Sequence, residues 1–311
     1  MSDFMRHNAT EVSFKSSDSW VILSPIELSI KRKIEAVGVP LKDWDINIYR
    51  GVLTGYNEAF IISTDKRNEI LSKCKDEDER KRTEELIRPI LRGRDIKRYG
   101  YEWAGLWLIW IPWHFPLHLD NSIKGASIEA EEAFMSHYSA VYDHLLQFKK
   151  ELSARNKAET GIRYEWYALQ RWGANYWDDF SKPKIIYPNM TKFMPFYYDK
   201  DCFMTNQKCF IITGKYTAFL TAFFNSSLFK YCFRDAFPEL QGGTRELSKI
   251  FFDKIPVPQV DEDTDNLFQE LITELQAKPS KALIIHIDNL IFNLYNLSSE
   301  ERKAIGFIEI Q

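Results

Sequence analysis

The spacing of apolar residues along the chain predicts several helices. In residues 25–36 they recur at Ile26, Ile30 and Ile34, with a proline in the first turn and a glycine just past the end, which is typical of a helix. Residues 126–154 repeat apolar positions at three- or four-residue steps and predict the longest helix. Shorter helices are expected at about residues 64–73, 77–88 and 216–235.

Strands are predicted where apolar residues alternate with polar ones or form short runs. Ile46, Ile48 and Arg50 alternate with their neighbours, and a second strand at residues 60–62 follows a glycine-containing turn. A buried strand is expected within residues 105–112 and an extended segment at 254–260, where two prolines preclude a helix. These elements predict an α+β fold, a twisted mixed or antiparallel sheet region with flanking helices. Three more short strands are expected at residues 184–188, 194–199 and 208–213.

The pattern changes near residue 259, where acidic amphipathic helices are predicted at about 263–277 and 280–295. From Gln259 onward there are ten acidic and four basic residues, a net charge of −6, which leaves +3 of the total of −3 for residues 1–258. We therefore expect a recognition domain over residues 1–259 and a helical tail over residues 260–311. The acidic tail would dock on a partner or form a dimer, not contact DNA.

Composition is that of a soluble globular protein with a substantial core, 45% hydrophobic and 27% charged. The longest apolar run, Leu106–Pro112, is too short for a membrane span, and the amino-terminal residues lack the apolar core of a secretory signal. A cytoplasmic location with reduced thiols is therefore expected. The four cysteines and six histidines show no metal-ligand spacing, so no metal site is assigned.

Motifs for catalysis were sought in the same sequence. It contains no Gly-rich nucleotide loop, no Gly-x-Ser-x-Gly elbow and no Asp-rich calcium loop. An adenine methyltransferase needs an Asn/Asp-Pro-Pro-Tyr/Phe loop, which is also missing, and the string nearest to a nuclease motif, Glu79-Arg80-Lys81, falls in a helical charge run. No catalytic residue is assigned, and binding is favoured over catalysis.

Basic residues concentrate within the stretch Arg80–Arg98, which holds eight of them against three acidic ones, a local net charge of +5. Aromatic residues are also abundant, at 15% with nine tryptophans, and such side chains suit a surface that stacks as well as a filled core. Local positive charge with aromatic surface is typical of proteins that bind nucleic acid.

Five strings in order resemble one family. They are RGVLTGYNEAF (residues 50–60), IRPILRGRDI (87–96), KPKIIY (182–187), FFNS (223–226) and the closing element at 247–258. The family is the TaqI-like carboxy-terminal specificity domain, the target-recognition region of adenine-specific DNA methyltransferases and of fused type IIG restriction-modification enzymes. The resemblance spans about residues 20–260, and the tail at 287–302 is similar to the helix that ends such proteins.

This resemblance implies that the chain recognises a sequence in double-stranded DNA as the specificity module of a restriction-modification system. The family's amino-terminal catalytic domain does not occur in this sequence. S-adenosylmethionine and Mg²⁺ are therefore expected for that missing domain or subunit, with no cofactor in this chain. Two alternatives stay open: a fragment or subunit with nuclease or methyltransferase activity, and a protein-assembly module that does not contact DNA.

Candidate DNA contacts come first from two polar segments. Thr54 and Asn57 belong to a turn that either connects a hairpin or faces DNA, where asparagine can bind adenine through two hydrogen bonds. Arg92 and Arg94 flank a glycine and could approach DNA closely, although a solvated loop paired with Asp95 would explain them as well. The remaining candidates, from strand ends, basic stretches and polar loops, are Arg50, Lys97, Arg98, Arg171, Tyr187, Asn189, Lys192, Gln241, Thr244 and Arg245.

Overall fold

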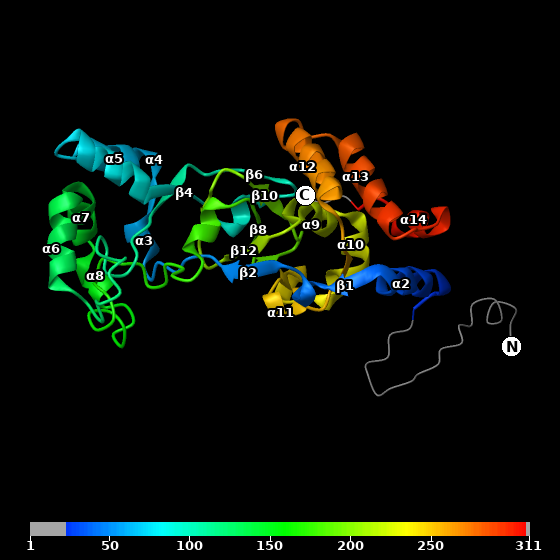
Figure 1. The fold of residues 1–311 in the computed structure, drawn as a ribbon, viewed down its shortest axis with the longest axis horizontal. Coiled ribbons are helices and arrows are strands. Elements are labelled where there is room, and N and C mark those ends of the chain that lie inside the picture. The colour runs from blue at the N-terminus through cyan, green and yellow to red at the C-terminus, as the bar shows by residue number, and fades with distance from the viewer. Residues whose placement is uncertain (1–22, 309–311) are drawn as a thin grey trace, which may run out of the picture.

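The computed structural model describes residues 23–308, which form an elongated molecule with a helical lobe at each end and strands between them (Figure 1). Each lobe is built around its own hydrophobic core. Within the described range, no helix has the length and apolar character needed to cross a membrane. The amino-terminal residues, which lack the apolar core of a secretory signal, lie outside the described residues.

A four-stranded antiparallel sheet, with strand order β10-β8-β12-β2, lies at the centre. Successive side chains of a strand point to opposite faces. Accordingly, Ile185, Tyr187 and Ile212 enter one core, whereas Ile186 and Ile211 enter the other. Both faces of the sheet are therefore covered, and the sheet joins the two lobes. Its strands are β2 (Ile46–Arg50), β8 (Lys184–Pro188), β10 (Tyr197–Asp199) and β12 (Cys209–Gly214).

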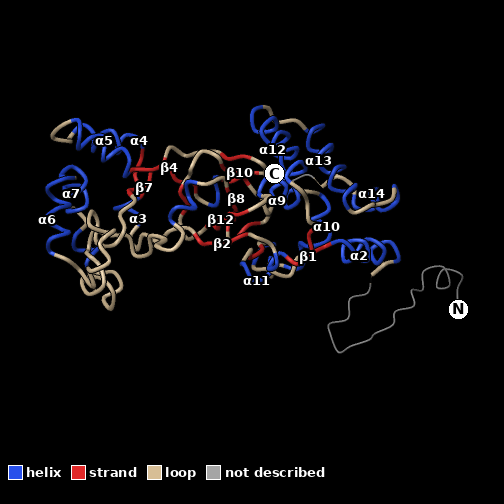
Figure 2. Tube along the Cα trace, in the orientation of Figure 1, coloured by secondary structure: helices blue, strands red, loops and turns tan. Residues whose placement is uncertain are grey.

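The first lobe contains a mixed sheet of order β11-β4-β7-β3, in which β11 is parallel to β4 and the other pairs are antiparallel. Figure 2 shows that long loops fill much of this lobe beside its helices. Its strands are β3 (Ile61–Ser63), β4 (Ile87–Leu91), β7 (Leu106–Ile109) and β11 (Met204–Thr205). Its helices are α3 (Asn57–Phe60), α4 (Thr64–Ser72), α5 (Glu77–Leu86), α6 (Ile128–His137), α7 (Ser139–Leu146) and α8 (Lys149–Ser153).

The second lobe is mostly helical and packs aromatic residues of its central helix against the tail. The rings of Phe219 and Phe268 are in a tilted contact with centroids 5.4 Å apart, and both residues are buried. Its helices are α2 (Pro25–Val37), α9 (Thr217–Asn225), α10 (Ser227–Phe233), α11 (Lys249–Phe252), α12 (Glu262–Ala277), α13 (Lys281–Leu294) and α14 (Ser299–Ile305).

Short strand pairs and 3-10 turns connect these parts. Two antiparallel pairs join segments that are distant in the sequence: β1 (Gly38–Pro40) with β14 (Pro256–Pro258), and β9 (Met190–Thr191) with β13 (Arg245–Glu246). A third pair, β5 (Ile96–Lys97) with β6 (Gly100–Tyr101), is a local hairpin. The 3-10 turns are η1 (Leu41–Asp43), η2 (Gly93–Asp95), η3 (Trp177–Ser181), η4 (Arg234–Ala236) and η5 (Gln241–Gly243). The prediction of an α+β fold with mixed and antiparallel sheets and flanking helices is confirmed.

Two local predictions need correction. The long helix expected over residues 126–154 is three helices, because the backbone leaves helical geometry at Tyr138 (φ −137°, ψ 47°) and Phe148 (φ −110°, ψ 10°). The strands predicted on either side of the 50s turn both exist, but they do not pair: β2 pairs with β12, and β3 pairs with β7.

The boundary predicted near residue 259 does not separate two cores. Phe268 and Ile272 of α12, and Ile287 and Ile291 of α13, share one core with Phe219 of α9. The tail helices therefore complete the second lobe.

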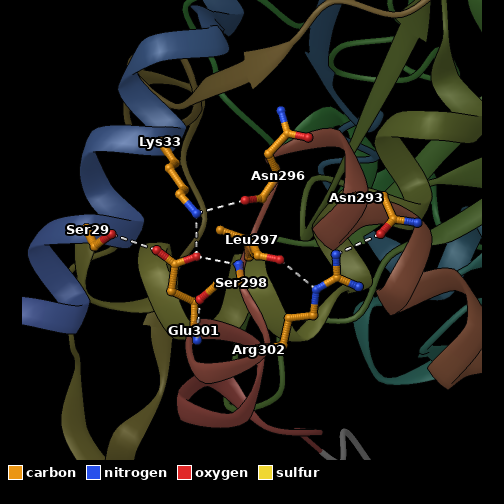
Figure 3. A network of polar contacts seen from close by, with 8 residues as sticks. All are labelled: Ser29, Lys33, Asn293, Asn296, Leu297, Ser298, Glu301 and Arg302. Carbon is orange, nitrogen blue, oxygen red and sulfur yellow. Dashed lines mark hydrogen bonds and ion pairs between the residues drawn. The ribbon is translucent and has the colours of Figure 1, made fainter.

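A polar network also fastens the tail to the amino-terminal helix (Figure 3). Glu301 of α14 accepts hydrogen bonds from Ser29 and Lys33 of α2, each at 2.7 Å, and caps its own helix through Ser298. Burial opposes the charged carboxylate, yet the donors of Lys33, Ser29 and Ser298 hold the pKa of Glu301 at about 2. Helix α2 begins with a similar capping box, in which Ser24 and Glu27 exchange hydrogen bonds.

Candidate nucleic-acid interface

A cleft of about 910 Å³ lies where the two lobes meet the central sheet. Its walls come from the start of α3, the segment from η2 to β5, the turn after β8 and the turn between β11 and β12. These segments are far apart in the sequence and meet only in the folded chain. Five of the predicted site residues line it: Asn57, Arg92, Arg94, Lys97 and Asn189.

Most of the charged residues in the lining are cationic. Arg92, Arg94, Lys97 and Lys208 face one acidic residue, Glu58. Arg92 and Lys97 are already engaged by carboxylates on the protein, whereas Arg94 and Lys208 are exposed and form no ion pair within residues 23–308. Two cationic side chains are therefore available for an anionic ligand.

The Arg92 pair shapes this part of the wall. Asp95, which is 4% exposed, accepts hydrogen bonds from the Arg92 main-chain N–H at 2.8 Å, from Nε at 3.0 Å and from Nη2 at 2.9 Å. The hydrogen bond to Asp95 raises the pKa of Arg92. Between them, a Cβ on Gly93 would lie 3.1 Å from Cβ of Pro188, so glycine allows this turn to pass close to β8. The Arg92–Asp95 ion pair holds η2 in place, and the neighbouring Arg94 side chain stays exposed.

Asn189 brings an unpartnered polar group to the same cleft. It is 5% exposed, and its Oδ1 has no hydrogen-bond partner in the part of the chain that the structure describes. Its backbone is fixed, because its N–H donates to the Lys208 carbonyl and its own carbonyl accepts from Leu247 N–H, both at 2.8 Å. A buried polar atom without a partner costs free energy unless a ligand or water satisfies it.

The 50s turn places one predicted residue at the cleft and buries the other. Thr54 is 1% exposed, and its hydroxyl donates to Asn57 Oδ1 at 2.7 Å. Asn57 is exposed at the cleft. Thr54 therefore orients the Asn57 side chain and has no surface of its own for DNA.

This chain was compared with known proteins. A family model, the TaqI-like C-terminal specificity domain, matches residues 88–257, which include most of the cleft wall. The chain belongs to the TaqI-like specificity domain family. No curated protein sequence matches the chain.

Two solved structures resemble the fold of this specificity domain. The type IIG restriction endonuclease BpuSI matches with a TM-score of 0.53 at 12% identity, over 91% of this chain and 32% of that protein. The type IIL restriction-modification enzyme MmeI, solved in complex with DNA, matches with a TM-score of 0.51 at 10% identity, over 86% of this chain and 36% of that protein. The specificity domain thus spans about a third of the length of each.

A smaller hollow of about 380 Å³ adjoins the cleft of the specificity domain, and Phe193 lines both. Exposed Lys192 and the glycines of η5 line this side hollow, because β9 pairs with β13 and brings the 190s turn beside the 240s loop. Gln241 is exposed and Thr244 half-buried on that loop, and neither lines the hollow itself.

Three predicted residues serve the interior of the domain. Tyr187 is 0% exposed and stacks on Phe210 with centroids 5.5 Å apart. Arg98 donates to the Asn225 carbonyl at 2.7 Å, and Arg245 donates to the Phe237 carbonyl at 3.0 Å and pairs with Asp235 and Glu239. These contacts correct the prediction that Tyr187, Arg98 and Arg245 face DNA, because their polar atoms are buried or already engaged.

Two other predicted residues lie outside the cleft. Arg50 is exposed at the end of β2 and donates from Nε to the Gln207 carbonyl at 2.8 Å. Arg171 is exposed, and its main chain bridges to Leu53. Neither contributes to the cleft wall.

Sequence reasoning missed Lys208, Met190 and Phe193, which all line the cleft. Lys208 follows Asn206-Gln207 in the turn between two short strands, and a polar turn of that kind was a usable signal. Met190 and Phe193 carried no signal, since apolar residues beside a strand normally predict core. Within the described residues, no three His, Cys, Asp or Glu side chains are arranged to hold a metal ion.

Proposed function

We propose that this specificity domain binds double-stranded DNA in the cleft and reads its sequence, as the target-recognition part of a restriction-modification system. The observation that carries the proposal is the meeting on one concave wall of Arg94 and Lys208, which form no ion pair within residues 23–308, with Asn189, whose Oδ1 has no hydrogen-bond partner there. Family membership and the fold shared with BpuSI and MmeI, the latter solved with DNA, support it.

Affinity would come mainly from contacts to phosphates. Lys192 and Lys208 are point charges on flexible stems, placed around the rim of the cleft and the side hollow; Lys97 could join them only by leaving its ion pair with Glu102. Lysines of this kind neutralise phosphates and release counterions, so binding weakens as salt rises. The glycine-rich 240s loop, with Gln241 and Thr244, lies beside Lys192 and would add polar contacts to the sugar-phosphate backbone of the DNA.

Base recognition is assigned to Arg94, Asn189 and Asn57. A guanidinium without a carboxylate partner can donate two hydrogen bonds to guanine, and a carboxamide can bind adenine through two. Each such pair discriminates by about 1–3 kcal/mol against the wrong base. Asn189 is held rigidly through its backbone, which favours reading over non-specific contact.

Methylation and cleavage would be performed by another domain or subunit. S-adenosylmethionine and Mg²⁺ would serve that catalytic part. Glu58 is the one acidic residue in the cleft lining among the described residues, so the lining offers no cluster of carboxylates for Mg²⁺.

Selection from a pool of random duplexes tests the proposal. The full chain is immobilised, bound duplexes are eluted with salt, and the recovered pool is sequenced after successive rounds. We expect one short sequence to be enriched and its binding to weaken steeply with salt. Absence of both enrichment and salt-dependent binding would show that the chain is an assembly module without DNA contact.

A further inference from the structure

Two large apolar side chains are exposed in the cleft, beside its cationic residues. Met190 is 52% exposed and Phe193 is 47% exposed, and both line the cleft. Phe193 also lines the side hollow, so it lies on the ridge between two basic concavities. Among the described residues, its ring pairs with no other aromatic ring, whereas the phenylalanines of the nearby core form many such pairs.

The turn that carries Phe193 is rigid. The hydroxyl oxygen of Thr191 accepts hydrogen bonds from the N–H groups of Phe193 at 3.1 Å and Met194 at 3.3 Å. Met194 has a positive φ of 52°, and its carbonyl accepts a hydrogen bond from the buried Nζ of Lys230. Pairing of β9 with β13 anchors the other side of the turn. The backbone that carries Phe193 is therefore already ordered, and no entropy has to be spent on ordering this turn when the ring meets a ligand.

An exposed ring on an ordered turn among cations suits an apolar partner that also carries negative charge. Leaving a phenylalanine half exposed forgoes part of the hydrophobic stabilisation that its burial would contribute. The flat faces of bases in a duplex, bordered by phosphates, supply both properties. Proteins that bend DNA insert such side chains between base pairs and unstack them.

Resting on the proposed function of the cleft, we propose that Phe193, backed by Met190, inserts into the base stack of the bound duplex and opens one base step. Lys192, which precedes Phe193 in the sequence and lines the side hollow, and Lys208, which lines the cleft, hold the phosphates of the distorted strand. The affinity for a given DNA sequence then depends in part on how easily that base step deforms, although no hydrogen bond reads the bases there.

The probe is a fluorescein-labelled duplex of arbitrary sequence, in an intact form and in a form with one central abasic site. A missing base removes much of the unstacking cost. The wild-type chain is therefore expected to bind the abasic duplex about tenfold more tightly. Phe193→Ala should remove this preference, and Phe193→Trp, which keeps a flat ring, should retain it.

Ile250→Ala is the matched control, because Ile250 is 64% exposed outside the cleft. It should leave the abasic preference intact, and thermal melts of all variants should coincide. Equal binding of both duplexes by the wild type, or a preference that survives in Phe193→Ala, overturns the insertion while leaving the proposed function standing. Failure to bind either duplex at low salt overturns both.

Discussion

Arg155 donates a hydrogen bond from Nη1 to the main-chain carbonyl oxygen of Thr54, at 2.6 Å. The guanidinium is 7% exposed and has no carboxylate partner in the described structure. It instead donates to main-chain carbonyls on three sides, and so fixes the turn that presents Asn57 to the cleft. The other acceptors are the carbonyls of Leu152, Trp166 and Ala168.

Replacing this guanidinium is expected to destabilise the first lobe. Arg155→Met leaves four carbonyl oxygens without a donor and should lower the free energy of unfolding by about 3–5 kcal/mol. Burial lowers the pKa of Arg155 to about 10, so the side chain is charged at neutral pH. Urea denaturation measures the change. Arg163→Met, at an exposed position in the same lobe, is the control, and equal stability of the two variants would contradict the prediction.

The link between α2 and α14 should make stability depend on acid pH. Hydrogen bonds depress the folded-state pKa of Glu301 from 4.5 to about 2. The stabilisation it contributes is therefore complete above its unfolded pKa and disappears as pH falls towards about 2. Relative to Glu301→Gln, the wild type should be more stable at neutral pH and lose that advantage over this window.

Chemical denaturation at a series of pH values tests this dependence. Glu300→Gln is the control, because its exposed neighbouring carboxylate should leave the pH profile unchanged. An advantage over Glu301→Gln that persists at the lowest pH would show that the carboxylate's charge is not responsible.

Lys208 should contact a phosphate and not a base. Lys208→Ala is expected to weaken binding to every duplex by a similar factor and to reduce the slope of log affinity against log salt by about 1. Fluorescence anisotropy across a salt series gives the slope. Lys215→Ala, which removes an exposed lysine outside the cleft, should leave it unchanged. An unaltered slope in Lys208→Ala would remove this lysine from the interface.

Local elements could be predicted from the sequence because their signals are local. The strand at residues 184–188 was placed at the observed bounds, and the first helix was placed to within one residue. Long-range pairing could not be predicted, since nothing near β2 or β3 shows that their partners are β12 and β7. The helix breaks at Tyr138 and Phe148 could not be predicted, because the apolar stripe continues across all three helices and packs into one core.

The site could be predicted only as segments. The 50s turn, the η2 segment and the residues after β8 were each chosen for local reasons, and the fold brings them to one cleft. The direction of a side chain could not be predicted. Tyr187, for example, points into the core of the second lobe because side chains alternate between the two faces of β8. Arg98 donates a hydrogen bond to the main-chain carbonyl of Asn225, which is more than a hundred residues away in the sequence.

The Arg94 side chain is the sharpest probe of whether this cleft reads a DNA sequence. Affinities of wild type, Arg94→Ala and the control Arg80→Ala are measured for the selected duplex and for a scrambled one; Arg80 is an exposed arginine on α5, outside the cleft. Arg94→Ala should lose about 1–3 kcal/mol of discrimination between the two duplexes, whereas Arg80→Ala should keep all of it. If Arg94→Ala discriminates between the duplexes as well as the wild type does, the cleft does not read the sequence through Arg94 and the proposed recognition is wrong.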